Sequence, residues 1–259
     1  MPLSPAQPVD LPPSVANRRL VPEVMDDPTL APALHEAALR GLGRINRLSR
    51  SAAMLWPAID AAATRQTRRP LRVLDLACGG GDVLIQLAKR AAALGKPIEF
   101  AGADVSPVAL EYAQRQAEAS GVFGATKIHW HEVDVFTQPL PHGYDLTMNS
   151  LFMHHLNESQ AIEVLAKMKA ASDTVLVNDL RRGPVAHAVT VVGTRLLSRS
   201  PVVHVDGPRS VRAAWTPGEL AALAQHAGLT GHSLRRRFPW RMLLEWRRPD
   251  ATPNRGSAA

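Results

Sequence analysis

The sequence has very little cysteine. Among its 259 residues there is a single one, Cys78. One thiol cannot form a disulfide within a chain, so a disulfide-stabilised secreted scaffold is excluded and a cytoplasmic location is expected. The length and a hydrophobic content of 46% suit one α/β core with an accessory segment.

Long apolar runs are also missing. No run approaches the roughly 20 residues that a membrane-spanning helix needs. Residues 1–13 are rich in proline and lack the basic start and apolar core of a signal peptide. We therefore expect neither a membrane span nor export.

Acidic residues are outnumbered, with 23 against 30 basic ones, which gives a net charge of +7. Such an excess makes nucleic acid a partner to consider. The basic residues, however, are spread from Arg18 to Arg255, with only short runs such as 235–237. This distribution is more typical of a compositional bias than of a binding surface. We expect a small-molecule partner and no nucleic acid. The sequence does not decide whether the protein forms a homodimer.

The stretch from Leu71 to Leu84 contains the clearest local pattern. Residues 72–76 are typical of a buried parallel strand, and a glycine-rich turn follows at 78–81. Asp82 stands where a helix N-cap is expected, and apolar residues then recur at helical spacing. A strand, a glycine turn and a helix predict a cofactor-binding crossover, because glycines let a ligand approach the backbone and the helix N-terminus closely.

Two common cofactor loops do not match this turn. The dinucleotide fingerprint G-x-G-x-x-G and the Walker Gly-Lys-Ser/Thr motif are both missing. The residues from Asp75 to Asp82, DLACGGGD, instead resemble the D/E-x-G-x-G-x-G signature of class I S-adenosylmethionine (SAM) dependent methyltransferases. Ala77 replaces the first glycine, a mild departure that adds one methyl group.

Three further strands follow in the order that this resemblance implies. The first covers 98–104 and ends in Asp104, whose two oxygens can accept both ribose hydroxyls. The second, from Lys127 to Val133, leads into Asp134, and the resemblance implies that this residue accepts from the adenine amine. The third covers 144–149. The resemblance spans about 71–180 and implies SAM as cofactor, S-adenosylhomocysteine (SAH) as product and these cofactor-binding residues: Asp75, Ala77, Cys78, Gly79, Gly81, Asp82, Asp104, Val105, Asp134, Val135, Phe136, Asn149, Ser150 and Leu151.

The loop after the 144–149 strand contains the candidate catalytic residues His154 and His155. Imidazole titrates near neutrality, so one of them could remove a proton from the methyl acceptor. Spacing does not decide between them. Expected substrate-binding residues are Phe152, Arg181, Arg182 and His204. No metal site is expected, because Asp145 and Asp179 alone are too few ligands.

The predicted fold is α/β: a Rossmann-like, doubly wound sheet of seven strands with a C-terminal antiparallel hairpin, N-terminal helices and an inserted lid segment. The predicted parts are a disordered arm (1–20), an N-terminal helical lid (21–66), the SAM-binding core (67–183), a lid insert (184–213), the C-terminal part of the core (214–248) and a tail (249–259). Within the insert we expect one amphipathic helix followed by a loop at 201–208.

Three functions are compatible with these patterns. The favoured one is O-methylation of a phenolic or enolic, fairly apolar metabolite, because 18–50, the HHL loop and 178–182 are similar to bacterial methyltransferases associated with type III polyketide synthases. A C-methyltransferase of the quinone-biosynthesis type shares the same core motifs. An RNA or protein methyltransferase is less favoured, because Asn149-Ser150-Leu151-Phe152 stands where such enzymes carry Asn-Pro-Pro-Tyr or a similar motif.

Overall fold

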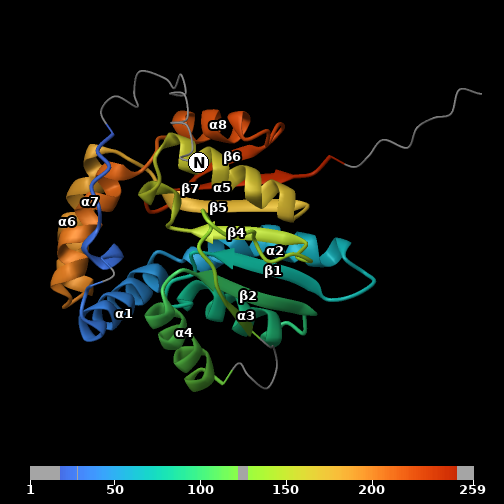
Figure 1. Cartoon of the computed structure of the whole chain (residues 1–259), viewed down its shortest axis with the longest axis horizontal. Coiled ribbons are helices and arrows are strands. Elements are labelled where there is room, and N and C mark those ends of the chain that lie inside the picture. The colour runs from blue at the N-terminus through green and yellow to red at the C-terminus, as the bar shows by residue number, and fades with distance from the viewer. Residues whose placement is uncertain (1–17, 28, 122–127, 250–259) are drawn as a thin grey trace, which may run out of the picture.

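The computed structural model describes residues 18–27, 29–121 and 128–249 (Figure 1). Most of the predicted arm, the start of the predicted strand at Lys127 and nearly all of the predicted tail lie outside these ranges. A seven-stranded sheet in the order β3-β2-β1-β4-β5-β7-β6 forms the centre. The strands are β1 (Leu71–Leu76), β2 (Ile98–Asp104), β3 (Ile128–Glu132), β4 (Leu146–Ser150), β5 (Thr174–Leu180), β6 (Ser233–Arg237) and β7 (Arg241–Arg247).

Strands β1 to β5 pair in parallel, whereas β7 pairs antiparallel with both β5 and β6. The predicted fold class, including the C-terminal hairpin, is therefore confirmed. Alternate residues of the central strands enter two separate cores. Val73 belongs to one core and Leu74 to the other, as the two-residue period of a strand buried on both faces requires.

Helices cover both faces of the sheet. On one face, α2 (Ser51–Arg65) and α3 (Asp82–Ala93) pack against β1, β2 and β4, and α4 (Pro107–Ala119) lies beside α3. On the other face, α5 (Glu158–Ala171) and α8 (Pro217–His226) enclose the second core. Among the described helices, none combines the length and apolar character needed to cross a membrane.

A separate layer lies off one end of the sheet (Figure 1). It consists of α1 (Pro32–Leu48), α6 (Pro184–Leu197) and α7 (Pro201–Ala213), which contact one another. The short 3-10 helices η2 (Val24–Asp26) and η4 (Met153–His155) also contact α7. Because η4 follows the end of β4, this layer covers the carboxyl ends of the parallel strands, where open α/β sheets bind ligands.

The expected loop at 201–208 is wrong, because these residues begin α7. Pro201 occupies the first helical position, where its missing N–H is harmless. Gly207 allows α7 to approach α6 closely, since a Cβ there would stand 2.5 Å from the methyl carbon of Thr194. Glycine and proline, which predict a loop locally, here serve helix packing.

The segment 21–66, expected as one N-terminal lid, contains two helices with different positions in the fold. α1 runs through Gly41 and Gly43 without a break, and a Cβ on Gly41 would stand 2.3 Å from the Ser198 hydroxyl. The chain turns instead at Arg50, which has a positive φ of 57°. α2 then packs into the sheet core, so only the part before it lies in the layer at the strand ends.

Candidate active site

The glycine turn after β1 has a strained, open backbone. Ala77, Gly79 and Gly81 have φ angles of 53°, 51° and 69°. The two glycines adopt this left-handed region freely, whereas Ala77 does so at a cost of about 1–2 kcal/mol. Gly81 is the N-cap of α3, and Asp82, the expected cap, is instead its first helical residue. The helix N-terminus and its free N–H groups therefore face the end of β1.

Carboxylates end the strands beside this turn. Asp104 accepts from the Gly79 N–H at 2.7 Å and from the Ser106 N–H at 2.9 Å, which ties the end of β2 to the turn. Burial raises the pKa of Asp104, although these hydrogen bonds oppose the shift. Asp134 accepts from the Phe136 N–H at 2.9 Å and from the Thr137 hydroxyl at 2.8 Å. A carboxylate has about four acceptor sites, so both residues retain acceptors for a ligand.

Several buried polar atoms next to the turn have no hydrogen-bond partner among the described residues. They include one oxygen each of Asp75, Asp82 and Asn149, and the Nη1 atom of Arg241. Native interiors rarely leave such atoms unpaired, so this cluster indicates a polar ligand. Unpaired carboxylate oxygens fit an ammonium group and an unpaired guanidinium nitrogen fits a carboxylate, and the methionine part of SAM carries both.

Arg241 and Asn46 are site residues that the sequence analysis missed. The Asn46 amide donates to Asp82 at 3.3 Å, and the Arg241 guanidinium donates to the Ser49 hydroxyl at 3.1 Å. Burial lowers the pKa of Arg241 to about 10, against the attraction of Asp179 and Asp82. These residues come from the first helix and the last strand, so no local motif links them to the glycine turn.

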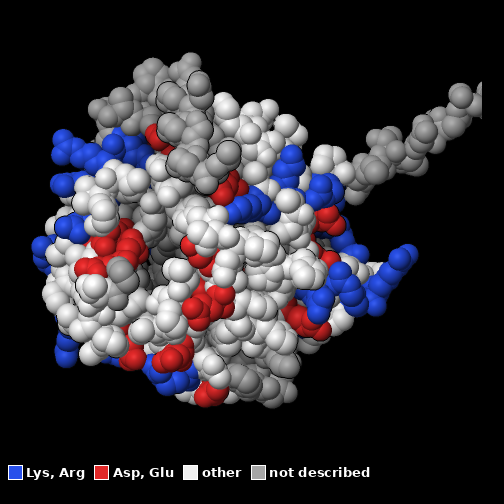
Figure 2. All heavy atoms as spheres, viewed as in Figure 1, with Lys and Arg blue, Asp and Glu red and all other residues white. Residues whose placement is uncertain are grey.

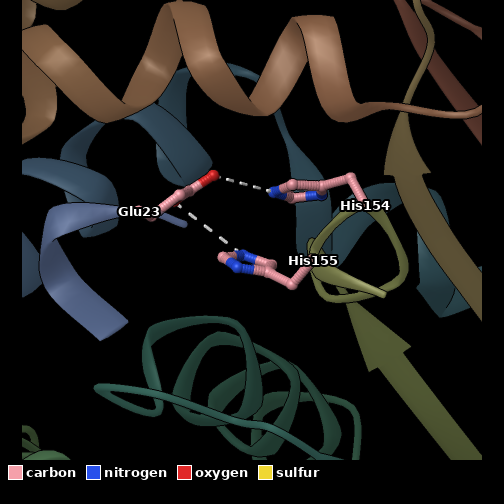
Figure 3. A group of neighbouring side chains, drawn as sticks. All are labelled: Glu23, His154 and His155. Atoms are coloured by element: carbon pink, nitrogen blue, oxygen red, sulfur yellow. Dashed lines mark ion pairs between the residues drawn. The ribbon is translucent and has the colours of Figure 1, made fainter. Parts of the chain in front are cut away.

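The two histidines lie side by side on η4 (Figure 3), and their Nδ1 atoms have different partners. His154 is only 3% exposed, and its Nδ1 lies 2.7 Å from Asp179 Oδ1. The His154 backbone N–H also donates to Asp179 Oδ2 at 3.0 Å. His155 is more exposed, its Nδ1 lies 2.9 Å from Asp26 Oδ2, and Phe152 stacks beside it. Each imidazole is thus oriented through Nδ1 by its own carboxylate.

Glu23 joins the two imidazoles. Its Oε1 lies 3.7 Å from His154 Nε2, and its Oε2 lies 3.9 Å from His155 Nε2 (Figure 3). Ser210 of α7 donates to Glu23 Oε1 at 2.5 Å. Burial raises the pKa of Glu23, although both histidines and Ser210 favour its charged form.

The charges around the histidines shift two further groups. Burial opposes charge on His155, but its hydrogen bond to Asp26 and the charge of Glu23 outweigh burial and raise its pKa to about 9. Burial also opposes charge on Asp179. The attraction and hydrogen bond of His154 outweigh it, so the pKa of Asp179 lies below its usual range. At neutral pH, His155 is therefore a cation and Asp179 an anion.

The segment that carries Glu23 and Asp26 is firmly attached. Asp206 of α7 accepts from the Val24 and Met25 N–H groups at 2.9 and 3.0 Å. Arg18, which the sequence analysis assigned to the disordered arm, donates to the carbonyls of His154 and Leu156 at 2.8 Å each. Its guanidinium also lies 3.4 Å from the Trp215 ring centre. Arg18 is therefore an ordered residue whose side chain holds η4.

A cavity of about 400 Å³ opens between this segment and η4. This volume lies within the range of small-molecule sites. Its lining combines apolar side chains with acid and histidine groups. The lining residues are Leu20, Val21, Pro22, Glu23, Asp26, His154, His155 and Ala213.

The expected substrate-binding residues are scattered. Phe152 lies beside the cavity against His155, whereas Arg182 forms an ion pair with Glu219 of α8. The Arg181 Nε atom is buried without a partner among the described residues. His204 lies on α7 with its Nε2 2.7 Å from the Ser198 carbonyl oxygen, and it is not among the residues that line the cavity. His204 therefore contacts the backbone at Ser198, and its expected contact with the substrate stays a prediction.

Basic side chains on the face shown in Figure 2 form separate groups, most of them near its margins and one near its centre, with acidic groups between them. No continuous basic surface is visible on that face among the described residues. The expectation of no nucleic-acid partner stays a prediction.

Comparisons with known proteins agree with this geometry. Residues 73–173 match the family model described as "Methyltransferase domain". The solved structure of the SAM-dependent methyltransferase SibL superposes with a TM-score of 0.61 at 20% identity, covering 90% of this chain and 64% of that one. The fold and the glycine turn thus define a class I methyltransferase. The chain is a SAM-dependent methyltransferase, and its cofactor is SAM.

Three relatives show the range of similar enzymes. Ubiquinone biosynthesis O-methyltransferase of Neisseria meningitidis is 25% identical over 72% of this chain and 81% of its own length. Demethylmenaquinone methyltransferase of Thermus thermophilus is 37% identical over 38% of this chain and 41% of its own. The 3-hydroxy-5-methyl-1-naphthoate 3-O-methyltransferase of Streptomyces sahachiroi is 29% identical over 54% and 39%. The chain therefore spans less than half the length of the last two.

Proposed function

We propose that the protein transfers a methyl group from SAM to a phenolic or enolic oxygen of a fairly apolar, polyketide-like small molecule. The observation that carries this proposal is the His154–Asp179 pair. The two side chains lie 2.7 Å apart, and His154 lines a cavity at the carboxyl ends of the strands. Two relatives named as O-methyltransferases, one of them for a hydroxynaphthoate, support oxygen as the acceptor.

The cofactor residues divide by the part of SAM that each suits. Asp104 suits the ribose hydroxyls, and Asp134 with the neighbouring residues Val135 and Phe136 suits the adenine. The unpaired oxygens of Asp75 and Asp82 suit the ammonium group. When bound, SAM supplies an electrophilic methyl group, and transfer then requires an aligned acceptor without its proton.

His154 is the proposed general base. With its Nδ1 proton donated to Asp179, its Nε2 atom has a free lone pair that can accept the proton of the acceptor hydroxyl. Asp179 holds the ring in this tautomer and stabilises the imidazolium that forms. His155, already a cation, stabilises the developing oxyanion beside it. The proposal thus chooses between two histidines that spacing alone leaves equivalent.

The apolar part of the cavity supports an apolar acceptor. Leu20, Val21, Pro22 and Ala213 face it, and no lysine or arginine is among its lining residues. Such a wall favours a ring or alkyl group over a sugar or a phosphate. The hydroxyl to be methylated then lies at the histidine end.

The test is an acceptor panel. Purified protein is incubated with methyl-labelled SAM and a set of phenols, hydroxynaphthoates, quinols and alkylated pyrones, and each product is fragmented by mass spectrometry. The proposal expects the label on oxygen of an aromatic or enolic acceptor. Label on ring carbon would instead favour quinone-type C-methylation, and methylation of RNA or protein alone would refute both.

A further inference from the structure

Both imidazoles in the cavity present the same nitrogen to one carboxylate. His154 and His155 each use Nδ1 for a carboxylate, Asp179 or Asp26, at 2.7 and 2.9 Å. Their Nε2 atoms then both face Glu23, and the three potential ligand atoms lie within 4.8 Å of one another. Metal-binding histidines have this arrangement, in which an outer carboxylate orients the ring and raises its basicity.

The spacing is close to that of a metal site. Zn²⁺ bonds of about 2.0–2.1 Å in tetrahedral geometry place ligand atoms about 3.3 Å apart. The observed separations from Glu23 are 3.7 and 3.9 Å. The two contacts use different oxygens of Glu23, and all three ligand atoms lie within 4.8 Å of one another, so side-chain movements of up to about 1.5 Å would close the difference. From the sequence, Asp145 and Asp179 were the candidate acidic ligands, and no local pattern links Glu23 to the two histidines.

The local charge also favours a cation. Glu23, Asp26 and Asp179 surround the two histidines, and Asp206 lies behind η2. Arg209 contacts Asp206 at 3.7 Å, and Arg18 holds the backbone of η4, so neither guanidinium contacts the carboxylate of Glu23. Among the described residues, the Glu23 carboxylate therefore has only the two histidines as ion-pair partners.

We infer that Glu23, His154 and His155 bind one divalent transition-metal ion of the Zn²⁺ or Co²⁺ type. Two imidazoles and one carboxylate suit these ions better than Mg²⁺ or Ca²⁺, which prefer oxygen ligands. The cavity leaves the remaining coordination position open to a water molecule or a small ligand. Asp26 and Asp179 are the outer carboxylates of this site.

Ion binding has a consequence that rests on the proposed function. The Nε2 lone pair of His154 cannot bind an ion and accept a proton at the same time, and ion binding at His155 releases its Nε2 proton to solvent. Occupancy of the site therefore blocks methyl transfer, and a chelator restores it. This makes the proposed ion an inhibitor that competes with the acceptor.

The test uses tag-free, full-length protein treated with a chelator and then titrated with Co²⁺. The inference expects one ion per chain by calorimetry, together with the visible absorption of Co²⁺ bound to nitrogen ligands. Glu23→Gln replaces the charged carboxylate ligand with a neutral amide, and His155→Gln removes the imidazole nitrogen, so each should weaken binding at least 100-fold. Asp26→Asn leaves all three ligands and should weaken binding about 10–100-fold.

His226→Ala is the matched control, since His226 is exposed on α8 and its Nδ1 lies 2.8 Å from the carbonyl oxygen of Ala222 in the same helix. It should bind Co²⁺ like the wild type, and SAH binding verifies the fold of every variant. The inference is overturned if the wild type binds no stoichiometric ion, or if Glu23→Gln and His155→Gln bind as well as it does. Stoichiometric binding without loss of methyl transfer would uphold the metal site and refute His154 as the base.

Discussion

Replacing Asp179 with asparagine tests the proposed base most sharply. Asp179 Oδ1 accepts from His154 Nδ1 at 2.7 Å and from the Leu180 N–H at 2.6 Å, and Oδ2 accepts from the His154 N–H at 3.0 Å. Asparagine has only one acceptor oxygen, so its amide NH₂ must face one of these donors. If it faces the ring, it forces the His154 proton onto Nε2 and removes the lone pair that the mechanism needs.

Either orientation leaves a buried N–H group unpaired. An unpaired buried donor costs about 1–3 kcal/mol, and loss of the charged partner of His154 adds to this. We expect Asp179→Asn to lower the free energy of unfolding by about 2–4 kcal/mol. We expect kcat to fall about 10²–10⁴-fold, the usual contribution of general base catalysis. SAM affinity should stay within a few-fold of wild type.

The assay combines urea unfolding, calorimetric SAM binding and kcat at saturating acceptor. Asp145→Asn is the control, because Asp145 precedes β4 at the opposite end of the sheet and pairs with Arg69. It should leave kcat within about twofold of wild type. An Asp179→Asn protein that folds, binds SAM and keeps more than half of the wild-type kcat would refute the reasoning.

The remaining predictions concern the cofactor turn. A Cβ on Gly102 would stand 2.7 Å from the Trp130 ring and 2.8 Å from Cys78 Sγ. Gly102→Ala should therefore destabilise the protein by about 1–3 kcal/mol and weaken SAH binding. Gly218→Ala is the control, because a Cβ there meets open space, and it should destabilise the protein far less. Ala77→Gly removes the strain of a positive φ, worth about 1–2 kcal/mol, but increases the entropy of the unfolded chain by about 0.5–1 kcal/mol. Urea unfolding should therefore show a free energy of unfolding that is higher by up to about 1 kcal/mol. A clearly lower free energy of unfolding would contradict the strain at Ala77. Partial burial raises the pKa of the half-buried Cys78 thiol, so iodoacetamide should modify it more slowly at pH 8 in folded protein than in urea; equal rates would contradict the raised pKa.

The core was predictable because its signals are local. The strand and glycine turn at 71–81 and the carboxylate at Asp104 follow one another at short range. Their order along the chain fixes a parallel sheet, since crossover helices separate the strands. The ends of the parallel strands differ by at most two residues from the prediction, as at Thr174–Leu180 against 172–180.

The histidine site was only half predictable. His154 and His155 stand out because they are adjacent after a strand, but their roles depend on Asp179 and on Asp26, which lies 129 residues before His155. No spacing rule connects such residues, because the layer at the strand ends brings them together. Helix α7 was missed for a related reason: Gly207 is explained by its contact with Thr194 and not by its sequence neighbours.

The central claim is that the turn at 78–81 and the strand-end carboxylates form a site for SAM. Calorimetric titration of the folded, full-length protein with SAH tests this claim most directly. The account predicts one site per chain, with binding weakened at least 10-fold by Asp104→Asn and unaffected by Asp145→Asn. Folded wild-type protein that takes up neither SAH nor SAM would contradict it.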